Sequence, residues 1–157
     1  MQYYLIFLLL LNIIPGMVTG DELHLIVNGK SIHFEGDNWN EENWGFGFEY
    51  DYEQNVYLIP FISASVFLDS NEDVSKYLGG GVKRRFPFGG NFHFDAGIFA
   101  FLMTRQDYKD NTPFIGALPF ISLGNKIVAI NTTYVPAITP KSVGLVYFQV
   151  TFKIWEG

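Results

Sequence analysis

Three side chains could form a catalytic group if the fold brings them together: His33, Asp69 and Ser70. A serine hydroxyl beside an imidazole can act as a nucleophile, with the histidine as general base and a carboxylate supporting the charged imidazole. The competing interpretation is an ordinary turn, because Asp-Ser is a common turn dipeptide. Adjacent residues also do not easily arrange themselves around one histidine as a triad. From these residues alone the turn is the favoured interpretation.

The sequence offers little to other kinds of chemistry. No two of His24, His33 and His93 have a spacing that places two metal ligands on one face with a carboxylate, so we expect no metal site. The glycines at 79–81 do not form a phosphate loop, because no strand-to-helix context follows them.

The composition indicates one exported domain. Residues 1–20 hold a long apolar core followed by small residues, which predicts a secretory signal peptide, and residues 21–157 then form a single domain. The chain has no cysteine, a net charge of −6 and 18% aromatic residues. The charge argues against nucleic acid as a partner, and no second apolar stretch is long enough for a transmembrane helix. Two classes remain, a soluble ligand-binding barrel and an outer-membrane barrel.

Runs of β-branched and aromatic residues separated by turn residues predict an all-β protein with eight strands. The predicted strands are 23–33, 43–53, 55–68, 76–87, 91–104, 113–123, 125–135 and 143–154. Their connections alternate between tight turns and longer polar loops, which is typical of an antiparallel up-and-down transmembrane barrel.

One face of several strands is apolar without interruption. The even positions from Val56 to Leu68 carry no polar side chain, and Trp44, Phe46 and Phe48 lie on one face of the strand 43–53. Side chains alternate between the two sides of a sheet, so each set shares one side. A water-soluble barrel would turn polar residues outward, and we therefore favour a lipid-facing exterior.

The opposite faces change character along the strands. Lys83 and Arg85 lie towards the tight turns, whereas Gly79, Gly81 and Tyr77 lie towards the long loops. The interior is thus expected to be charged at one end and apolar at the other, where a packed core and a slot for an acyl chain are equally favoured. The candidate lining residues of such a slot are Gly47, Gly79, Gly81, Phe99, Phe101 and Tyr147. His33 ends the first predicted strand and Asp69-Ser70 follows the third, so all three share the long-loop rim.

From Trp44 to Phe152 the chain resembles the lipid A palmitoyltransferase (PagP) family of bacterial outer-membrane enzymes, as a divergent member. The resemblance rests on the order and spacing of several short stretches. These stretches are "NWGFGFEYD", "FLDS", "NFHFDAGIFAFLMTR", "ALPFISLGNK", "TTYVPAI" and "VYFQVTF". It implies an eight-stranded barrel in the outer membrane of a Gram-negative cell, with a hydrocarbon slot in its outer half.

The resemblance also implies roles for individual residues. His33, Asp69 and Ser70 match the family's catalytic residues, and Gly81 its slot-floor glycine. Arg105 matches a loop arginine that steadies the barrel. Pro119 and Pro136 match prolines that open lateral gates, which has a physical basis because proline cannot donate to a strand ladder.

The implied reaction moves a palmitoyl-like chain from a phospholipid to lipid A, without a cofactor, and we expect a monomer embedded in the membrane. We expect Ser70 to handle the acyl group, His33 to act as general base and Asp69 to give electrostatic support. Two alternatives stay open: a non-catalytic outer-membrane barrel that binds lipid or is purely structural, and a soluble lipocalin-like carrier.

Overall fold

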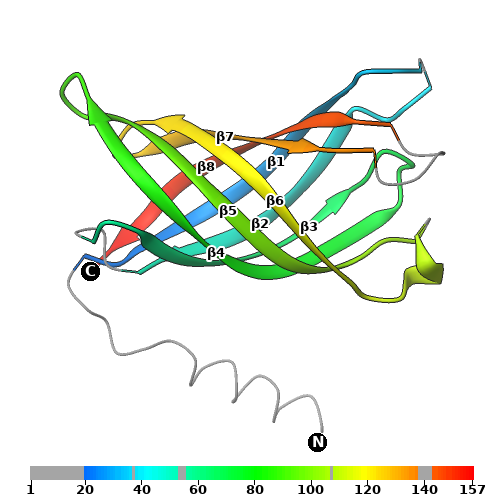
Figure 1. Cartoon of the computed structure of the whole chain (residues 1–157), viewed down its shortest axis with the longest axis horizontal. Helices are drawn as coiled ribbons and strands as arrows, with labels where there is room; N and C mark the ends of the chain where they lie inside the picture. The colour runs from blue at the N-terminus through cyan, green and yellow to red at the C-terminus, as the bar shows by residue number, and fades with distance from the viewer. Residues whose placement is uncertain (1–19, 37, 53–55, 107, 138–142) are drawn as a thin grey trace, which may run out of the picture.

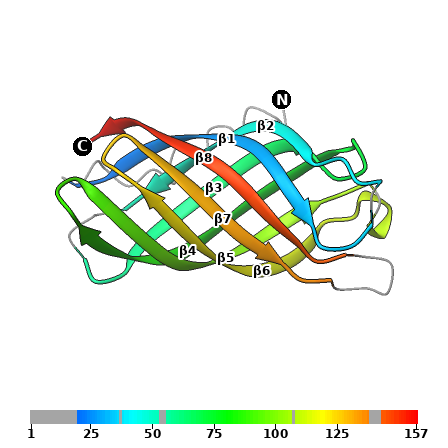
Figure 2. The ribbon, with the colours of Figure 1, turned by 90° about the horizontal axis from the view of Figure 1, so that it is seen from above.

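Eight antiparallel strands form a closed barrel in the computed structural model, which describes residues 20–36, 38–52, 56–106, 108–137 and 143–157. Each strand pairs with its neighbours in the sequence, and β8 pairs with β1 to close the barrel (Figure 1, Figure 2). The strands are β1 Glu22–His33, β2 Glu42–Asp51, β3 Ile59–Leu68, β4 Val74–Phe88, β5 Phe92–Thr104, β6 Phe114–Gly124, β7 Val128–Val135 and β8 Leu145–Glu156. A short 3-10 turn, η1 Lys109–Asn111, lies between β5 and β6.

The predicted fold class and strand order are confirmed, and two strands begin three or more residues later than predicted. β3 begins at Ile59 instead of 55, and β7 begins at Val128 instead of 125. Before β7, the side chain of Asn125 accepts hydrogen bonds from the backbone of Ile127 and Val128, which makes residues 125–127 a turn. Such Asn-stabilised turns compete with strand pairing. The predicted signal peptide falls, apart from Gly20, outside the described residues.

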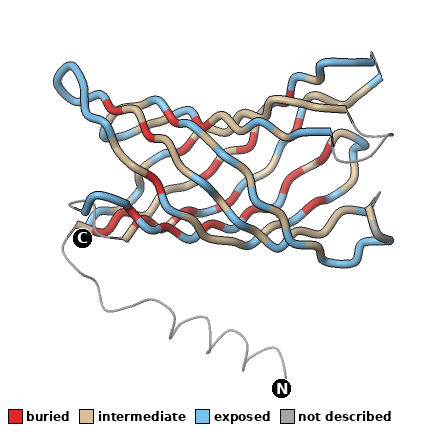
Figure 3. Tube along the Cα trace, viewed as in Figure 1, coloured by how far each residue is buried: buried red, intermediate tan, exposed pale blue. Residues whose placement is uncertain are grey.

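The outer surface of the barrel is apolar, as the alternation predicts. Trp44, Phe46 and Phe48 on β2 are 60%, 62% and 48% exposed, and outward residues of the other strands, such as Ile98 and Ile115, are equally open. Buried and exposed positions alternate along the strands (Figure 3). An apolar exterior on this scale is the surface that hydrocarbon solvates, so it fits a lipid environment. No helix among the described residues is long and apolar enough to cross a membrane.

A bulge at Gly29 sets the direction of the last residues of β1. The register with both neighbouring strands shifts between Asn28 and Lys30. Before the bulge the even positions face the interior, and after it Ser31 is buried while Lys30 is exposed. In a regular strand every second residue keeps its side, so Lys30 would face inward and His33 would face the lipid. The extra residue therefore turns His33 into the barrel.

The interior near the tight turns is a charged plug, which we define as Glu22, His24, Glu49, Asp51, Lys83, Arg85 and Asp95. Lys83 lies at its centre and is 4% exposed. Its Nζ lies 2.8 Å from Oε1 of Glu49 and 2.7 Å from Oδ2 of Asp51, while Arg85 pairs with Asp95 at 2.9 Å. Buried charges are tolerated when they are paired in this way. The charged half of the interior thus matches the sequence-based expectation.

Replacement of Lys83 by Met is expected to cost the folded barrel about 3–5 kcal/mol, because it leaves the buried carboxylates of Glu49 and Asp51 without their cation. Urea unfolding in detergent micelles measures the change. Lys76→Met is the control, since Lys76 is an exposed lysine on the same strand and should change stability by only about 0.5 kcal/mol. Equal effects of the two substitutions would contradict the plug's role.

Candidate functional site

His33 and Ser70 meet at the rim formed by the longer loops. His33 is the last residue of β1, Ser70 follows the end of β3, and Nε2 of His33 lies 2.9 Å from Oγ of Ser70. The His33 side chain is only 3% exposed. This distance is a hydrogen bond, and it joins the base and the hydroxyl that a nucleophilic mechanism needs. The strand ends predict that the two residues share one rim, and the structure brings them into contact there.

Trp39 covers the imidazole of His33. Their rings are stacked with centroids 5.3 Å apart and an angle of 15° between the planes. Nε1 of Trp39 donates to the carbonyl of Glu35, which closes the loop over the strand end. Gly36 has a φ of 85°, and a Cβ there would lie 2.9 Å from Trp39 Nε1, so this position favours glycine on both counts. The stacked indole limits the rotation of the imidazole.

Asn40 links the loop after β1 to the turn after β3. Its backbone N–H donates to the carbonyl of Ser70 at 3.0 Å, and its side chain donates to the carbonyl of Asp69 at 3.0 Å. The side-chain oxygen of Asn40 accepts from the backbone N–H of Glu42. These bonds tie the Asp-Ser turn to the segment that enters β2. They hold the Ser70 backbone in place beside the histidine.

Asp69 organises its own turn. Oδ1 accepts from the backbone N–H groups of Asn71 and Asp73, and Oδ2 accepts from the hydroxyl of Ser75 at 2.8 Å. Nε of Arg105, just after β5, lies 3.7 Å from Oδ2. None of the contacts described for the Asp69 carboxylate reaches His33. The carboxylate and the imidazole, which the sequence grouped together, are thus held by different partners.

Glu41 is the acidic side chain that approaches His33. Its Oε1 lies 3.7 Å from Nδ1 of the imidazole and accepts a hydrogen bond from the backbone N–H of His33 at 3.3 Å. No sequence pattern points to Glu41, because a loop glutamate next to another glutamate looks the same as solvated loop charge. The one usable signal is its place directly before the strand that pairs with β1.

An aromatic cluster fills the barrel interior below the rim. Its members are Phe67, Tyr77, Phe99, Phe101 and Tyr147, whose ring centroids lie 5.3–6.5 Å apart. The interior-facing glycines receive groups from neighbouring strands: a Cβ on Gly81 would lie 2.8 Å from the ring of Phe61, one on Gly79 2.8 Å from Cβ of Phe101, and one on Gly47 2.6 Å from Cβ of Ser65. A cavity beside Tyr77 and Phe99 has a volume of about 40 Å³. The described conformation therefore resembles the packed core more than the open slot.

A polar layer crosses this part of the interior, where the sequence predicted only apolar residues. Asn28 is fully buried, donates to Oγ of Ser65 at 2.6 Å, and accepts from the hydroxyl of Tyr147 and from Nε2 of Gln149. A buried amide needs partners of this kind. Below the layer, Phe61 separates the aromatic cluster from the plug, with Lys83 Nζ 5.2 Å from its ring centroid.

The ladder between β6 and β7 is short. It runs from Phe120–Thr133 to Gly124–Ala129, which is five residue pairs among the described residues, whereas β5 and β6 pair along the whole of β6. Pro119 is the residue next to the last pair, and it faces outward. Pro136 follows the end of β7. Both proposed gate residues therefore lie where strand pairing stops.

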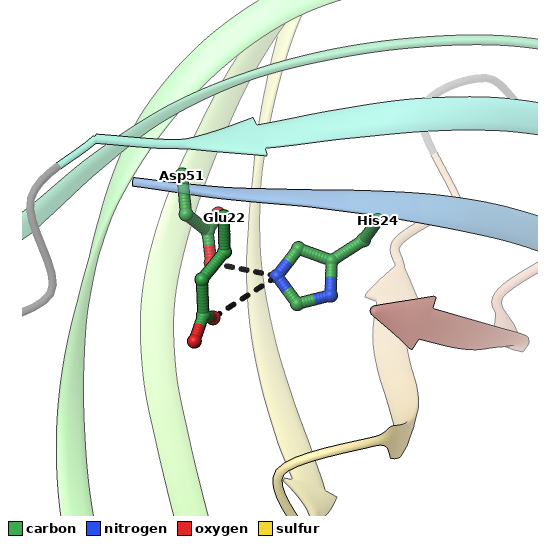
Figure 4. A group of neighbouring side chains, drawn as sticks. All are labelled: Glu22, His24 and Asp51. Carbon is green, nitrogen blue, oxygen red and sulfur yellow. Dashed lines mark ion pairs between the residues drawn. The ribbon is translucent and has the colours of Figure 1, made fainter. Parts of the chain in front are cut away.

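Three plug residues have the donor types of a metal site. Nε2 of His24 lies 3.2 Å from Oε2 of Glu22 and 3.4 Å from Oδ2 of Asp51 (Figure 4). Glu22 and His24 line a cavity of about 300 Å³ at the tight-turn end. The same carboxylate oxygens are already paired, since Oδ2 of Asp51 contacts Lys83 at 2.7 Å and Oε2 of Glu22 faces Arg85 at 3.7 Å. These cations disfavour a metal ion, so we assign the group to the ion-paired plug.

Comparisons with known proteins agree with the geometry. Residues 32–151 match the family model described as antimicrobial peptide resistance and lipid A acylation protein PagP. A "Lipid A acyltransferase PagP" of Bordetella pertussis is 32% identical over 128 residues, which cover 82% of this chain and 57% of that protein. A protein of the same name from Methylobacillus flagellatus is 34% identical over 64% of this chain and 54% of its own length.

Among solved structures, the Yersinia pestis outer membrane protein Ail matches with a TM-score of 0.44 and 12% identity, covering 85% of this chain and 99% of Ail. That similarity is too distant to bear on the fold or the function. The chain spans little more than half the length of the curated relatives named above. Since the family model matches residues 32–151, which include most of the barrel as well as His33 and Ser70, the chain belongs to the PagP family.

Proposed function

We propose that this barrel transfers an acyl chain from a phospholipid to lipid A in the outer membrane. The observation that carries the proposal is the 2.9 Å contact between Ser70 Oγ and His33 Nε2 at the mouth of an aromatic-lined interior. The names of the relatives support the acyl transfer and the lipid A acceptor. The membrane location supports a phospholipid donor, because phospholipids are acyl esters that a barrel in a membrane meets.

The rim residues suit a two-step transfer. In the first step Ser70 Oγ attacks the ester carbonyl of the donor, His33 Nε2 takes the hydroxyl proton, and that proton leaves with the lysophospholipid alkoxide. The acyl group is then an ester of Ser70. In the second step His33 takes a proton from a lipid A hydroxyl, which attacks this ester, and the proton returns to Ser70 as the serine ester breaks. No cofactor is needed.

The acyl chain is expected to lie in the aromatic part of the interior. Phe61 beside Gly81 marks the lower limit, because the charged plug begins beneath it. The cavity of about 40 Å³ is too small for a long chain, so entry requires rings such as Phe99 and Phe101 to move. This filled interior is also the observation that favours the alternative function, a barrel that carries no acyl chemistry.

Expression in a Gram-negative strain lacking this activity tests the function. Mass spectrometry of lipid A is expected to show one added acyl chain with the wild type and none with Ser70→Ala, because that variant has no hydroxyl to carry the acyl group. Ser122→Ala is the matched control, since Ser122 is a buried interior serine on β6, where β6 approaches its tight-turn end. A folded wild type that leaves lipid A unchanged would favour the non-catalytic barrel.

A cross-link tests the gap between β6 and β7 as a lateral entrance. Cysteines at Pro119 and Tyr134 would join the outward residues just past the last ladder pair, and the disulfide is expected to stop acyl transfer until it is reduced. Cysteines at Ile121 and Thr132, which already pair in the ladder, are the control and should leave activity unchanged when oxidised. Full activity of the oxidised Pro119–Tyr134 variant would mean that lipids enter elsewhere.

A further inference from the structure

We propose that Glu41, and not Asp69, is the carboxylate that orients His33 for proton transfer. This inference rests on the proposed function, because it assigns a positioning residue to the same site. It follows from which carboxylate approaches the imidazole, and from how many of each carboxylate's acceptor positions are already used.

Three of the acceptor positions of the Asp69 carboxylate are already used by hydrogen bonds within its own turn. An ionised carboxylate offers about four acceptor positions. Two are taken by the backbone N–H groups of Asn71 and Asp73 and a third by the hydroxyl of Ser75, and Arg105 faces the same oxygen as Ser75. To reach His33, Asp69 would have to give up bonds that shape the turn carrying Ser70. Its part in the site is therefore to place the serine.

Glu41 approaches the correct side of the imidazole. Nε2 of His33 faces Ser70, so a general base needs a lone pair on Nε2 and a proton on Nδ1. Oε1 of Glu41 lies 3.7 Å from Nδ1, and this side of the ring has no hydrogen-bond partner in the described structure. The distance is longer than a hydrogen bond, as is common in catalytic groups without bound substrate. A carboxylate there favours the tautomer protonated at Nδ1 and stabilises the imidazolium formed during transfer.

The local backbone holds Glu41 in this place. The backbone N–H of Ser31 donates to the Glu41 carbonyl at 3.0 Å, which extends the pairing of β1 with the chain entering β2. The preceding residue, Asn40, donates to the carbonyl of Asp69 and accepts from the backbone N–H of Glu42, so the residues on both sides of Glu41 are held. Oε1 also accepts the backbone N–H of His33 at 3.3 Å. One oxygen therefore lies near both the ring and the main chain of the histidine.

Burial disfavours the protonated imidazole of His33, the Glu41 carboxylate favours it, and the guanidinium of Arg105 disfavours it. Removing the Glu41 charge leaves burial and Arg105, which both act against the charged ring. The imidazole of a Glu41→Gln variant should then lose its proton at lower pH than that of the wild type.

Kinetics with purified protein in detergent micelles test the assignment, with Glu41→Gln, Glu41→Asp and Asp69→Asn as variants. Glu41→Gln is expected to lower kcat about 10²-fold with little change in KM, because the base is disoriented while lipid binding is intact. The rise of kcat/KM with pH should move to lower pH, and Glu41→Asp should restore part of the rate. Glu35→Gln, an exposed glutamate of the same loop, is the control. Unchanged kcat and pH profile in Glu41→Gln, with both altered in Asp69→Asn, would overturn the proposal.

Nitrogen-15 NMR of the three histidines gives a measurement that does not need activity, with the His33 signals assigned by their loss in His33→Gln. The wild type is expected to carry the neutral-ring proton on Nδ1 of His33, and Glu41→Gln to shift it towards Nε2 and to lower the pH at which the ring is half protonated. No shift would overturn the role of Glu41. A shift in a protein that does not acylate lipid A would keep this role and remove the proposed function, so the two failures are distinguishable.

Discussion

Every strand of this barrel presents one side to hydrocarbon, where the backbone has no water to bond. Its N–H and C=O groups must therefore pair with neighbouring strands, and the β8–β1 ladder supplies the last of these pairings. Closure decides what each position can hold, because successive side chains then face lipid or the interior. The apolar exterior, the paired charges around Lys83 and the aromatic cluster all follow from this constraint.

The position of the chemistry follows from the same constraint. A narrow closed barrel has an interior filled by side chains, and the cavity among its aromatic rings is about 40 Å³. The polar groups of the candidate site, which under the proposed function would meet a lipid headgroup, lie at the rim. One of them, His33, comes from a strand, while Ser70 and Glu41 come from the connections. Asn40 joins those connections, so the site depends on two loops holding each other in register.

Alternation and turn residues were enough to predict the strand order, the lipid-facing sides and the placing of His33 and Ser70 on one rim, but not their contact. They could not predict how the interior is filled, because Phe61 and Phe101, which lie against Gly81 and Gly79, belong to other strands. Asp69 was grouped with His33 because it precedes Ser70 in the sequence. In the structure the Asp69 carboxylate instead accepts hydrogen bonds from its own turn and from Ser75. Glu41 acts through loop geometry, which periodicity does not describe. The bulge at Gly29 carried a signal that was not used, namely an isolated glycine within a strand.

That bulge also determines how the strand responds to changes in length. His24 and His33 both face the interior although they are an odd number of positions apart, because Gly29 is the unpaired residue between them. Loss of Gly29 would leave a regular strand with the same residues inside. Loss of one residue elsewhere on β1 could be absorbed only if the bulge disappeared. In a strand that had no bulge, the same deletion would turn every residue beyond it to the opposite side of the sheet. The bulge thus acts as a length buffer, through which this strand can lose a residue and still present a histidine at the rim.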